Sequence, residues 1–384
     1  QQAEHNGHAA SWWKLLEENR GSFAFMSEPD QLCTIMFTSG TTGKSKGVML
    51  THRNVAENAT CLDMKIPERT VILTVLPIHH AYCLSMDILK GVSLGSVICI
   101  NDSLIRVAKN IKLFKPEMIL MVPLMIETMA RKLEEASLLP AGSVKSQVFG
   151  KQFHTICSGG AYLDPSYIDL FKKYGITIQQ GYGMTECAPV ISVNQSWNIR
   201  KDSVGQLLPN CEAKTVDGEL WVRGSSVMQG YYKMPEETAK AIDEEGYLHS
   251  GDMGTIDEEG YFRVTGRIKD MIIRGGENIY PLEVENFLLT MPGVLDAQVV
   301  GCPDEKYGEV VTAFIRTREG YEDMTQEDVR EYAIPRIARF KVPKFVFFVD
   351  EFPMNPANKI QKFKLRDMAK ELTGRTDQEV FDEE

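Results

Sequence analysis

The chain has 384 residues, of which 43% are apolar and 25% are charged, as in ordinary globular proteins and unlike disordered or fibrous ones. Its 42 basic and 53 acidic residues give a formal net charge of −11, which argues against a nucleic-acid binder, because such proteins need a basic surface. The apolar runs are too short for a transmembrane segment, which needs about 20 residues, and the first residues do not have the pattern of a signal peptide. Eight cysteines without a Cys-x-x-Cys pair predict reduced thiols in a cytoplasmic protein.

Short apolar runs alternate with helical patterns through the first half of the chain, after a polar lead-in of about 30 residues. Residues 32–37 predict a buried strand. The further predicted strands are 71–76, 96–100, 117–122, 153–157 and 176–180, with helices over 124–133 and 165–174. Strands separated by helices predict a mostly parallel sheet that helices cover.

Two further patterns follow. Glycine-punctuated strands such as 219–222 and 261–264 predict a β-rich module over 190–264. Beyond it, Pro281 begins a predicted helix that stops at Pro292-Gly293, Thr325 begins another, and strands are predicted over 294–301, 310–316 and 344–349. The predicted fold class is therefore α/β, with a large domain of parallel α/β layers plus a β-rich module (1–268) and a small α+β domain (269–384).

The segment 37–47, Phe-Thr-Ser-Gly-Thr-Thr-Gly-Lys-Ser-Lys-Gly, is the most informative part of the sequence. A loop of this composition after a strand can direct backbone N–H groups and hydroxyls at a polyphosphate, and Lys44 and Lys46 add positive charge. The kinase-type P-loop does not fit, because Thr38 stands where its first glycine belongs and an extended segment follows where a helix should begin. A flexible linker is the alternative interpretation.

This loop resembles the signature of the acyl-adenylate-forming superfamily, which includes acyl-CoA synthetases, luciferases and peptide-synthetase adenylation domains. Ser45 and Ser250 replace the family's usual Pro and Thr, and Asn358 and Lys362 replace its usual Gly and Arg. The resemblance extends from about residue 30 to about residue 367, since its other motifs follow in order. They are Leu76-Pro-Ile-His-His80, Ser158-Gly-Gly-Ala161, Gly181-Tyr-Gly-Met-Thr-Glu186, Gly218–Gly224, Gly230-Tyr231, Tyr247–Asp252, Gly266–Gly276, Asn278–Glu283 and Lys359–Lys362.

The resemblance implies a nucleotide site built from these motifs. The phosphate loop would hold the β- and γ-phosphates of ATP through Thr38, Ser39, Gly40, Thr41, Thr42, Gly43 and Lys46. The adenine pocket would be formed by Ser158, Gly159, Gly160, Ala161, Gly181, Tyr182 and Gly183. Within it, the Tyr182 ring would lie against the base. Asp252 would accept hydrogen bonds from both ribose hydroxyls, assisted by Arg267.

The remaining implied roles concern catalysis. Glu186 would bind Mg²⁺ together with the nucleotide phosphates, Thr185 would contact the α-phosphate, and His80 would act as a gate near the acyl pocket. Two positions belong to the small domain, where Lys359 would enter the site for adenylation and the Gly275-Gly276 loop would replace it for thiolation after rotation about Lys269. Composition alone also allows a solvated loop acid at 186, a core histidine at 80 and a surface lysine at 359.

The activity that the resemblance implies is an ATP-dependent acid–CoA ligase, with a small carboxylic acid, ATP/AMP, Mg²⁺ and coenzyme A as its partners. Apolar segments around 82–86 and 121–123, with Met184 and Cys187, favour an apolar acid such as a medium- to long-chain fatty acid. Three alternatives stay open. They are an aryl-acid ligase such as a succinylbenzoate–CoA ligase, an aminoacyl adenylation domain, which the lack of an acid before Asp87 disfavours, and a non-catalytic nucleotide-binding fragment.

Only 37 residues precede Thr38, where members of the superfamily carry a long stretch that completes the large domain. Loss of part of a sheet exposes apolar surface and strand edges. We therefore expect this chain alone to be less stable than a full-length member, and to form a homo-oligomer or to depend on the N-terminal segment.

Overall fold

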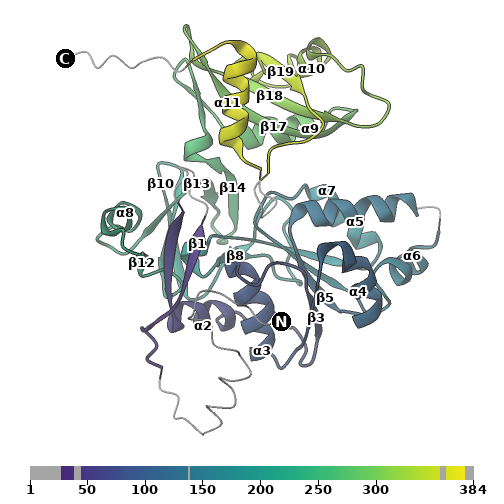
Figure 1. The fold of residues 1–384 in the computed structure, drawn as a ribbon, viewed down its shortest axis with the longest axis vertical. Helices are drawn as coiled ribbons and strands as arrows, with labels where there is room; N and C mark the ends of the chain where they lie inside the picture. The colour runs from purple at the N-terminus through teal and green to yellow at the C-terminus, as the bar shows by residue number, and fades with distance from the viewer. Residues whose placement is uncertain (1–26, 39–44, 137–138, 355–359, 377–384) are drawn as a thin grey trace, which may run out of the picture.

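The computed structural model describes residues 27–38, 45–136, 139–354 and 360–376. The predicted site residues Ser39, Gly40, Thr41, Thr42, Gly43 and Lys359 lie outside these ranges. The structure confirms the predicted α/β class, with four sheets in all within the described ranges (Figure 1). No helix in this part of the chain is long and apolar enough to cross a membrane.

A seven-stranded sheet forms the centre of the large part of the molecule. Its strand order is β4 (Val97–Ile100), β3 (Val71–Thr74), β5 (Met118–Met121), β6 (Thr155–Ser158), β7 (Thr177–Gly183), β8 (Val190–Val193) and β9 (Gln206–Leu207). The first five run parallel, and β8 and β9 are antiparallel. The four-residue cores of β3, β5 and β6 are nearly continuous apolar runs, as expected for strands buried on both faces.

Helices cover both faces of this sheet. One face packs against α4 (Val107–Phe114), α5 (Pro123–Glu135), α6 (Ala141–Val148) and α7 (Pro165–Lys173) through the largest apolar core. The other face contacts the seven-residue π-helix η1 (Cys83–Leu89), which continues into α3 (Lys90–Ser93). A short 3₁₀ turn, η2 (Leu104–Arg106), precedes α4.

The predicted buried strand at 32–37 exists but is not buried. It forms β1 (Leu32–Thr38), at the edge of a three-stranded sheet with β2 (Lys46–Thr51) and β12 (Gly230–Tyr231). Phe37 is 71% exposed, because β1 pairs only with β2 in the described chain. An apolar run alone does not distinguish an edge strand from a central one.

The β-rich character predicted over 190–264 is confirmed, but β8, β9 and β12 in this range belong to other sheets. The module itself has four antiparallel strands, in the order β10 (Cys211–Val216), β11 (Glu219–Gly224), β13 (Leu248–Ile256) and β14 (Phe262–Arg267). Helix α8 (Pro235–Ala241) interrupts the module before β13, and the 3₁₀ turn η3 (Thr185–Cys187) precedes β8.

The C-terminal residues form a separate sheet at one end of the molecule (Figure 1). After η4 (Ile268–Asp270) its strand order is β16 (Glu277–Ile279), β15 (Ile272–Arg274), β18 (Gly308–Thr317) and β17 (Val294–Asp304), with β19 (Phe345–Phe348) parallel to β18. Helices α9 (Pro281–Leu289) and α10 (Gln326–Ala333) pack on one face and α11 (Lys362–Thr373) on the other, and η5 (Arg339–Lys341) precedes β19. The capping box predicted for Thr325 is present. A domain boundary between 268 and 269 stays a prediction.

Helix α2 (His52–Thr60) joins the small β1–β2–β12 sheet to the rest of the large domain through two buried asparagines. The Asn58 amide donates to the carbonyls of Cys187 and Val190 at 3.1 and 2.7 Å, and its oxygen accepts from the N–H of Val190 at 3.2 Å. Asn54 donates to the carbonyls of Ser225 and Val227 at 2.7 and 2.9 Å. The first of these two loops follows the predicted motif that ends at Glu186, and the second lies just before the predicted motif Gly230-Tyr231.

We expect Asn58→Ala to lower the free energy of unfolding by about 2–4 kcal/mol, because it leaves several buried backbone groups without partners. Urea unfolding followed by circular dichroism measures this. The control is Asn198→Ala, since Asn198 is exposed and its loss should change stability by less than about 0.5 kcal/mol. Equal losses in the two variants would contradict the role of Asn58.

Candidate functional site

Two predicted nucleotide-binding segments lie side by side at the carboxyl ends of parallel strands. Ser158 ends β6 and Gly183 ends β7, and the two strands pair in register from Thr155 opposite Thr177. Ligands of open α/β sheets bind beyond these strand ends. The Ser158 hydroxyl is buried and has no hydrogen-bond partner within the described residues, so a polar atom is available for a ligand.

Glycine is required where β7 ends. A Cβ on Gly183 would collide with the carbonyl oxygen of Pro189, so any larger residue would push β8 away from β7. This close approach brings η3, with Thr185 and Glu186, directly against the sheet. The glycine of this motif therefore has a packing reason in addition to the predicted contact with nucleotide.

Three motifs far apart in sequence meet at Asp252. The Tyr182 hydroxyl donates to Oδ2 of Asp252 at 2.8 Å, and Nε of Arg267 lies 2.9 Å from Oδ1. Asp252 is only 3% exposed. Its carboxylate raises the pKa of the Arg267 guanidinium, and burial, with the same carboxylate, raises the pKa of the Tyr182 phenol. The Asp252 carboxylate is therefore held in one orientation by these two partners, and each oxygen keeps a lone pair for a further donor.

Glu186 is the second buried carboxylate of the site. Its Oε1 accepts a hydrogen bond from the Tyr231 hydroxyl at 3.0 Å, and burial together with Glu186 raises the pKa of that phenol. The ammonium of Lys46 lies 4.8 Å from the centre of the Tyr231 ring and pairs with Glu237 at 2.6 Å. Lys46, from the phosphate loop, and Glu186 are thus joined through one tyrosine.

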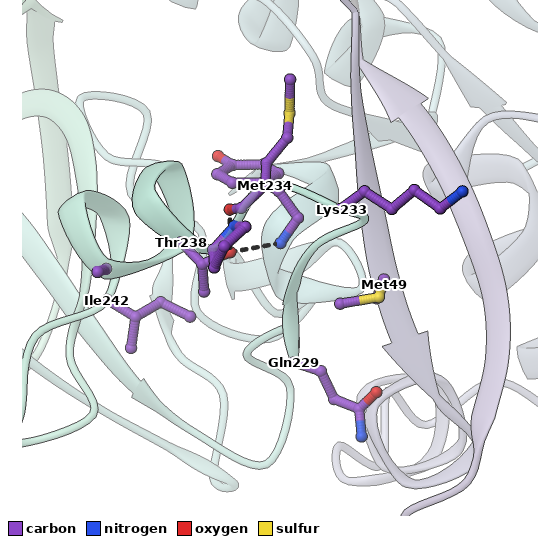
Figure 2. Close-up of a pocket in the computed structure, with 9 residues that line it drawn as sticks. Met49, Gln229, Lys233, Met234, Thr238 and Ile242 are labelled. Atoms are coloured by element: carbon purple, nitrogen blue, oxygen red, sulfur yellow. Dashed lines mark hydrogen bonds between the residues drawn. The ribbon is translucent and has the colours of Figure 1, made fainter.

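Tyr231 and Glu237 were not predicted as site residues, although the Gly230-Tyr231 motif marked the place. Helix α8 holds the backbone of Tyr231 in place. The Tyr231 N–H donates to the Thr238 hydroxyl at 2.9 Å, and that hydroxyl donates to the carbonyl of Met234 at 2.9 Å. Figure 2 shows this contact in an open groove between β2, β12 and α8. None of the predicted site residues that the structure describes lines that groove.

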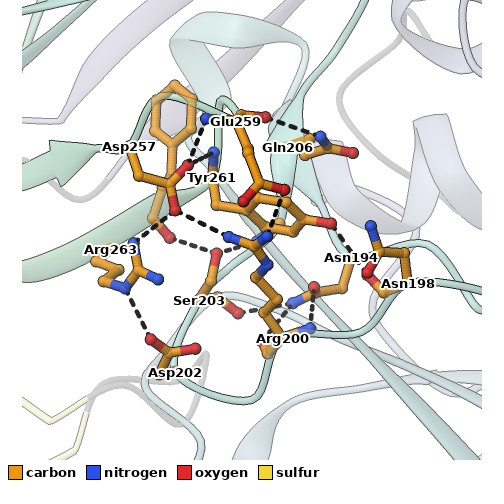
Figure 3. A network of polar contacts seen from close by, with 12 residues as sticks. Asn194, Asn198, Arg200, Asp202, Ser203, Gln206, Asp257, Glu259, Tyr261 and Arg263 are labelled. Carbon is orange, nitrogen blue, oxygen red and sulfur yellow. Dashed lines mark hydrogen bonds and ion pairs between the residues drawn. The ribbon is translucent and has the colours of Figure 1, made fainter.

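A charged network that sequence reasoning missed supports the strand that carries Arg267 (Figure 3). Asp257 accepts from Arg200 at 3.1 Å and from Arg263 at 3.0 Å, and Arg263 also pairs with Asp202 at 2.8 Å. The Ser203 hydroxyl donates to the carbonyl of Phe262 at 2.8 Å. These contacts join the loop after β8 to β14, and no spacing in the sequence indicated them.

The predicted small-domain residues Lys269, Gly275 and Gly276 make no hydrogen bond to this cluster in the described part of the chain. Lys269 lies in η4, where burial lowers the pKa of its ammonium and Arg267 adds to the effect, and its carbonyl accepts from Arg366 of α11 at 2.7 Å. Gly275 and Gly276 form the β15–β16 turn with φ of +60° and +86°. Among the described residues, no hydrogen bond or ion pair joins this turn to Tyr182, Glu186 or Asp252.

Three further predicted residues lie in turns or at strand ends. The ring of His80 is 5.1 Å from that of His79, in the turn after β3. Thr38 donates to the carbonyl of Lys46 at 3.5 Å and so closes the base of the phosphate loop. Thr185 begins η3, one residue before Glu186.

Comparison with known proteins identifies the family. The model of the AMP-binding enzyme family matches residues 3–232, and the model of the AMP-binding enzyme C-terminal domain matches residues 283–359. The long-chain-fatty-acid–CoA ligase of Escherichia coli O157:H7 is 34% identical over 360 residues, which are 89% of this chain and 62% of the ligase. The chain spans 62–66% of the length of the first curated relatives it matches.

Solved structures agree with this assignment. ATP-bound MatB from Rhodopseudomonas palustris is 30% identical, with a TM-score of 0.83 over 91% of this chain and 71% of that one. The o-succinylbenzoate CoA synthetase MenE from Bacillus subtilis, in complex with its acyl-adenylate intermediate, is 31% identical, with a TM-score of 0.77 over 89% of this chain and 70% of that one. MenE has also been solved with ATP and a magnesium ion.

We expect Tyr231→Phe to lower the free energy of unfolding by about 1–3 kcal/mol, because it removes a hydrogen bond to a buried carboxylate. Thermal or urea unfolding measures the change. Tyr232→Phe is the matched control, since the neighbouring side chain is 42% exposed, and it should behave like the unchanged protein. If both variants keep full stability, the Tyr231–Glu186 contact does not hold the site together.

Proposed function

The chain belongs to the AMP-binding enzyme family, and we propose that it is an ATP-dependent acid–CoA ligase. The carboxylate of the acid attacks the α-phosphorus of ATP, which forms acyl-AMP and releases pyrophosphate. The thiol of CoA then loses its proton and attacks the acyl carbon, so that the thioester forms and AMP leaves. The convergence of Tyr182, Glu186 and Asp252 on one strand end is the observation that carries this proposal.

The nucleotide would bind across the ends of β6 and β7. In this position the Tyr182 ring would stack on adenine while its hydroxyl keeps Asp252 oriented, and the Asp252 carboxylate would accept from the ribose hydroxyls. The segments 158–161 and 181–183 would form the adenine pocket. Thr185 would contact the α-phosphate, and the loop 38–46 would hold the β- and γ-phosphates.

Glu186 fits a magnesium ligand. Its carboxylate is buried and has one oxygen engaged by Tyr231, whose ring in turn contacts the phosphate-loop residue Lys46. In the described part of the chain no three His, Cys, Asp or Glu side chains gather into a metal site, so the ion would take its other ligands from phosphate and water. When bound, Mg²⁺ would neutralise charge on the phosphates.

Catalysis would then depend on positioned charge. Lys359 would supply an ammonium to the adenylation transition state, where negative charge is shared between the carboxylate and phosphorus. Rotation about Lys269 would remove it and bring the Gly275-Gly276 turn to the site, with His80 as the gate of the acyl pocket. The separation of that turn from Asp252 in this structure is consistent with a rotation before thiolation.

The acid is proposed to be apolar, a medium- to long-chain fatty acid by preference. The apolar sequence segments 82–86 and 121–123, with Met184 and Cys187, support this, as does the name of the Escherichia coli relative. An aryl acid is the second candidate, because the Bacillus subtilis neighbour is named for succinylbenzoate. The oligomeric state and the cytoplasmic location expected from the sequence stay predictions.

Pyrophosphate exchange and thioester formation test the proposal directly. The chain would be supplied with ATP, Mg²⁺ and CoA, and with octanoate, palmitate, benzoate or an amino acid in parallel. We expect exchange with the fatty acids and thioester only when CoA is present. Exchange confined to an amino acid would identify an aminoacyl adenylation domain, and nucleotide binding without exchange would identify a non-catalytic protein.

We expect Lys359→Ala to slow adenylation by about 10²–10³ and to leave thiolation nearly unchanged, because only the first step uses this ammonium. One assay supplies acid plus ATP, and the other supplies synthetic acyl-AMP plus CoA. Lys364→Ala is the matched control, since Lys364 is an exposed lysine of α11, and both of its rates should be unchanged. Equal loss of both reactions in Lys359→Ala would contradict a role confined to adenylation.

A further inference from the structure

Two helices of the C-terminal part meet at the edge of its sheet. Strand β17 pairs only with β18 in the described chain, so one of its sides has no strand partner. At Val299 the backbone groups on this side are bound by side chains instead. The N–H of Val299 donates to Oε1 of Glu285 on α9 at 2.8 Å, and its carbonyl accepts from the ammonium of Lys362 on α11 at 3.5 Å.

Glu285 and Lys362 also form an ion pair with each other. The ammonium of Lys362 lies 2.6 Å from the same Oε1 oxygen of Glu285, and the carboxylate side chain is only 8% exposed. Helices α9 and α11 pack on opposite faces of the sheet. The pair therefore connects the two faces around the edge of β17.

The local sequence does not explain a lysine at this position. Lys362 is the first residue of α11, and no side chain caps that end of the helix. The positive end of the helix dipole lies there, which disfavours a cation. A buried ion pair is also seldom more stable than two apolar side chains of similar size. The pair thus has a role other than the stability of α11.

The place of the pair in the chain indicates what this role is. Lys359, the proposed adenylation lysine, stands three residues before Lys362, a separation of at most about 11 Å of extended chain. The segment 355–359 itself lies outside the described residues. A shift of the start of α11 would move the backbone at Lys359 as well.

The described chain on either side of that segment is joined into one base. Met354 and Ile360 form an antiparallel bridge, and the N–H of Gln361 donates to the carbonyl of Pro353 at 2.8 Å. Ile360 packs against the apolar core between the sheet and α11. Lys362 follows directly, so its ion pair attaches this base to α9.

A second contact connects α11 to the proposed hinge. Arg366 stands four residues after Lys362, so the two side chains lie on the same side of the helix. The Arg366 guanidinium donates to the carbonyl of Lys269 at 2.7 Å and to the carboxylate of Asp270 at 3.1 Å. The helix that follows Lys359 is therefore held at α9 by one cation and at the hinge by another.

We propose that Lys362 and Glu285 are positioning residues for adenylation, because their ion pair fixes the start of α11 and so sets where the small domain presents Lys359. This inference rests on the proposed acid–CoA ligase function. The pair acts through Lys359 and not on the substrate. Its effect is geometric, since a misplacement of about 1 Å can cost about a hundredfold in rate. Thiolation does not use Lys359 and is independent of the pair.

A purely structural role would have different consequences. If the ion pair served only to close the edge of β17, its loss would disturb the small domain as a whole and slow both half-reactions to the same extent. A positioning role slows adenylation alone, and its effect disappears once Lys359 is absent. The two roles are therefore distinguished by comparing the half-reactions.

The experiment measures both half-reactions in variants of Lys362. Acid plus ATP and Mg²⁺ gives adenylation through pyrophosphate release, and synthetic acyl-AMP plus CoA gives thiolation. We expect Lys362→Met to slow adenylation by about ten- to a hundredfold and to leave thiolation nearly unchanged. Lys362→Arg, which can still pair with Glu285, should keep both rates. Lys364→Met is the matched control, since Lys364 is an exposed lysine of the same helix.

A double variant tests whether the pair acts through Lys359. Lys359→Ala combined with Lys362→Met should adenylate no more slowly than Lys359→Ala alone, because an absent ammonium cannot be misplaced. A further loss in the double variant would overturn the inference. Equal losses of adenylation and thiolation in Lys362→Met, or full activity of that variant in both reactions, would overturn it too.

The outcomes separate this inference from the proposed function. If the unchanged chain catalyses neither reaction, the ligase proposal fails and the inference fails with it. If the unchanged chain is active and Lys362→Met is not selectively slow in adenylation, only the inference fails. Should Lys362→Met not fold, Glu285→Gln provides the same comparison, because its amide oxygen can still accept from the N–H of Val299 while the charge is lost.

Discussion

The hydrogen bonds from helix α2 to two loops that are distant in sequence are the constraint on which the site depends. The side-chain amide of Asn58 satisfies backbone groups directly after Glu186, and that of Asn54 satisfies the segment that leads into β12 and Tyr231. Glu186 and Tyr231 meet because one short helix holds the chain on both sides of their contact. Backbone groups of irregular segments are costly to bury, and an asparagine that bonds several of them makes such segments stable in the interior.

The two carboxylates of the site are positioned in the same way. Asp252 is nearly inaccessible to solvent, and Arg267 and the Tyr182 hydroxyl each engage one of its oxygens. Glu186 accepts from the Tyr231 phenol, whose ring contacts Lys46 of the phosphate loop. A carboxylate held by few fixed partners keeps capacity for a ligand and loses little entropy when the ligand binds. This arrangement suits a site that must accept a ribose and a metal–phosphate group together.

The sequence by itself determined the order of strands and helices, the capped start of α10 and the motifs that become Tyr182, Glu186 and Asp252, because these depend on local periodicity and on short runs of residues. It could not decide that residues 32–37 form an exposed edge strand, since an apolar run has the same appearance in an edge and a central strand. Nor could it show that Tyr231 contacts Glu186. Those properties arise from pairing between segments distant in the chain, which only the tertiary structure decides.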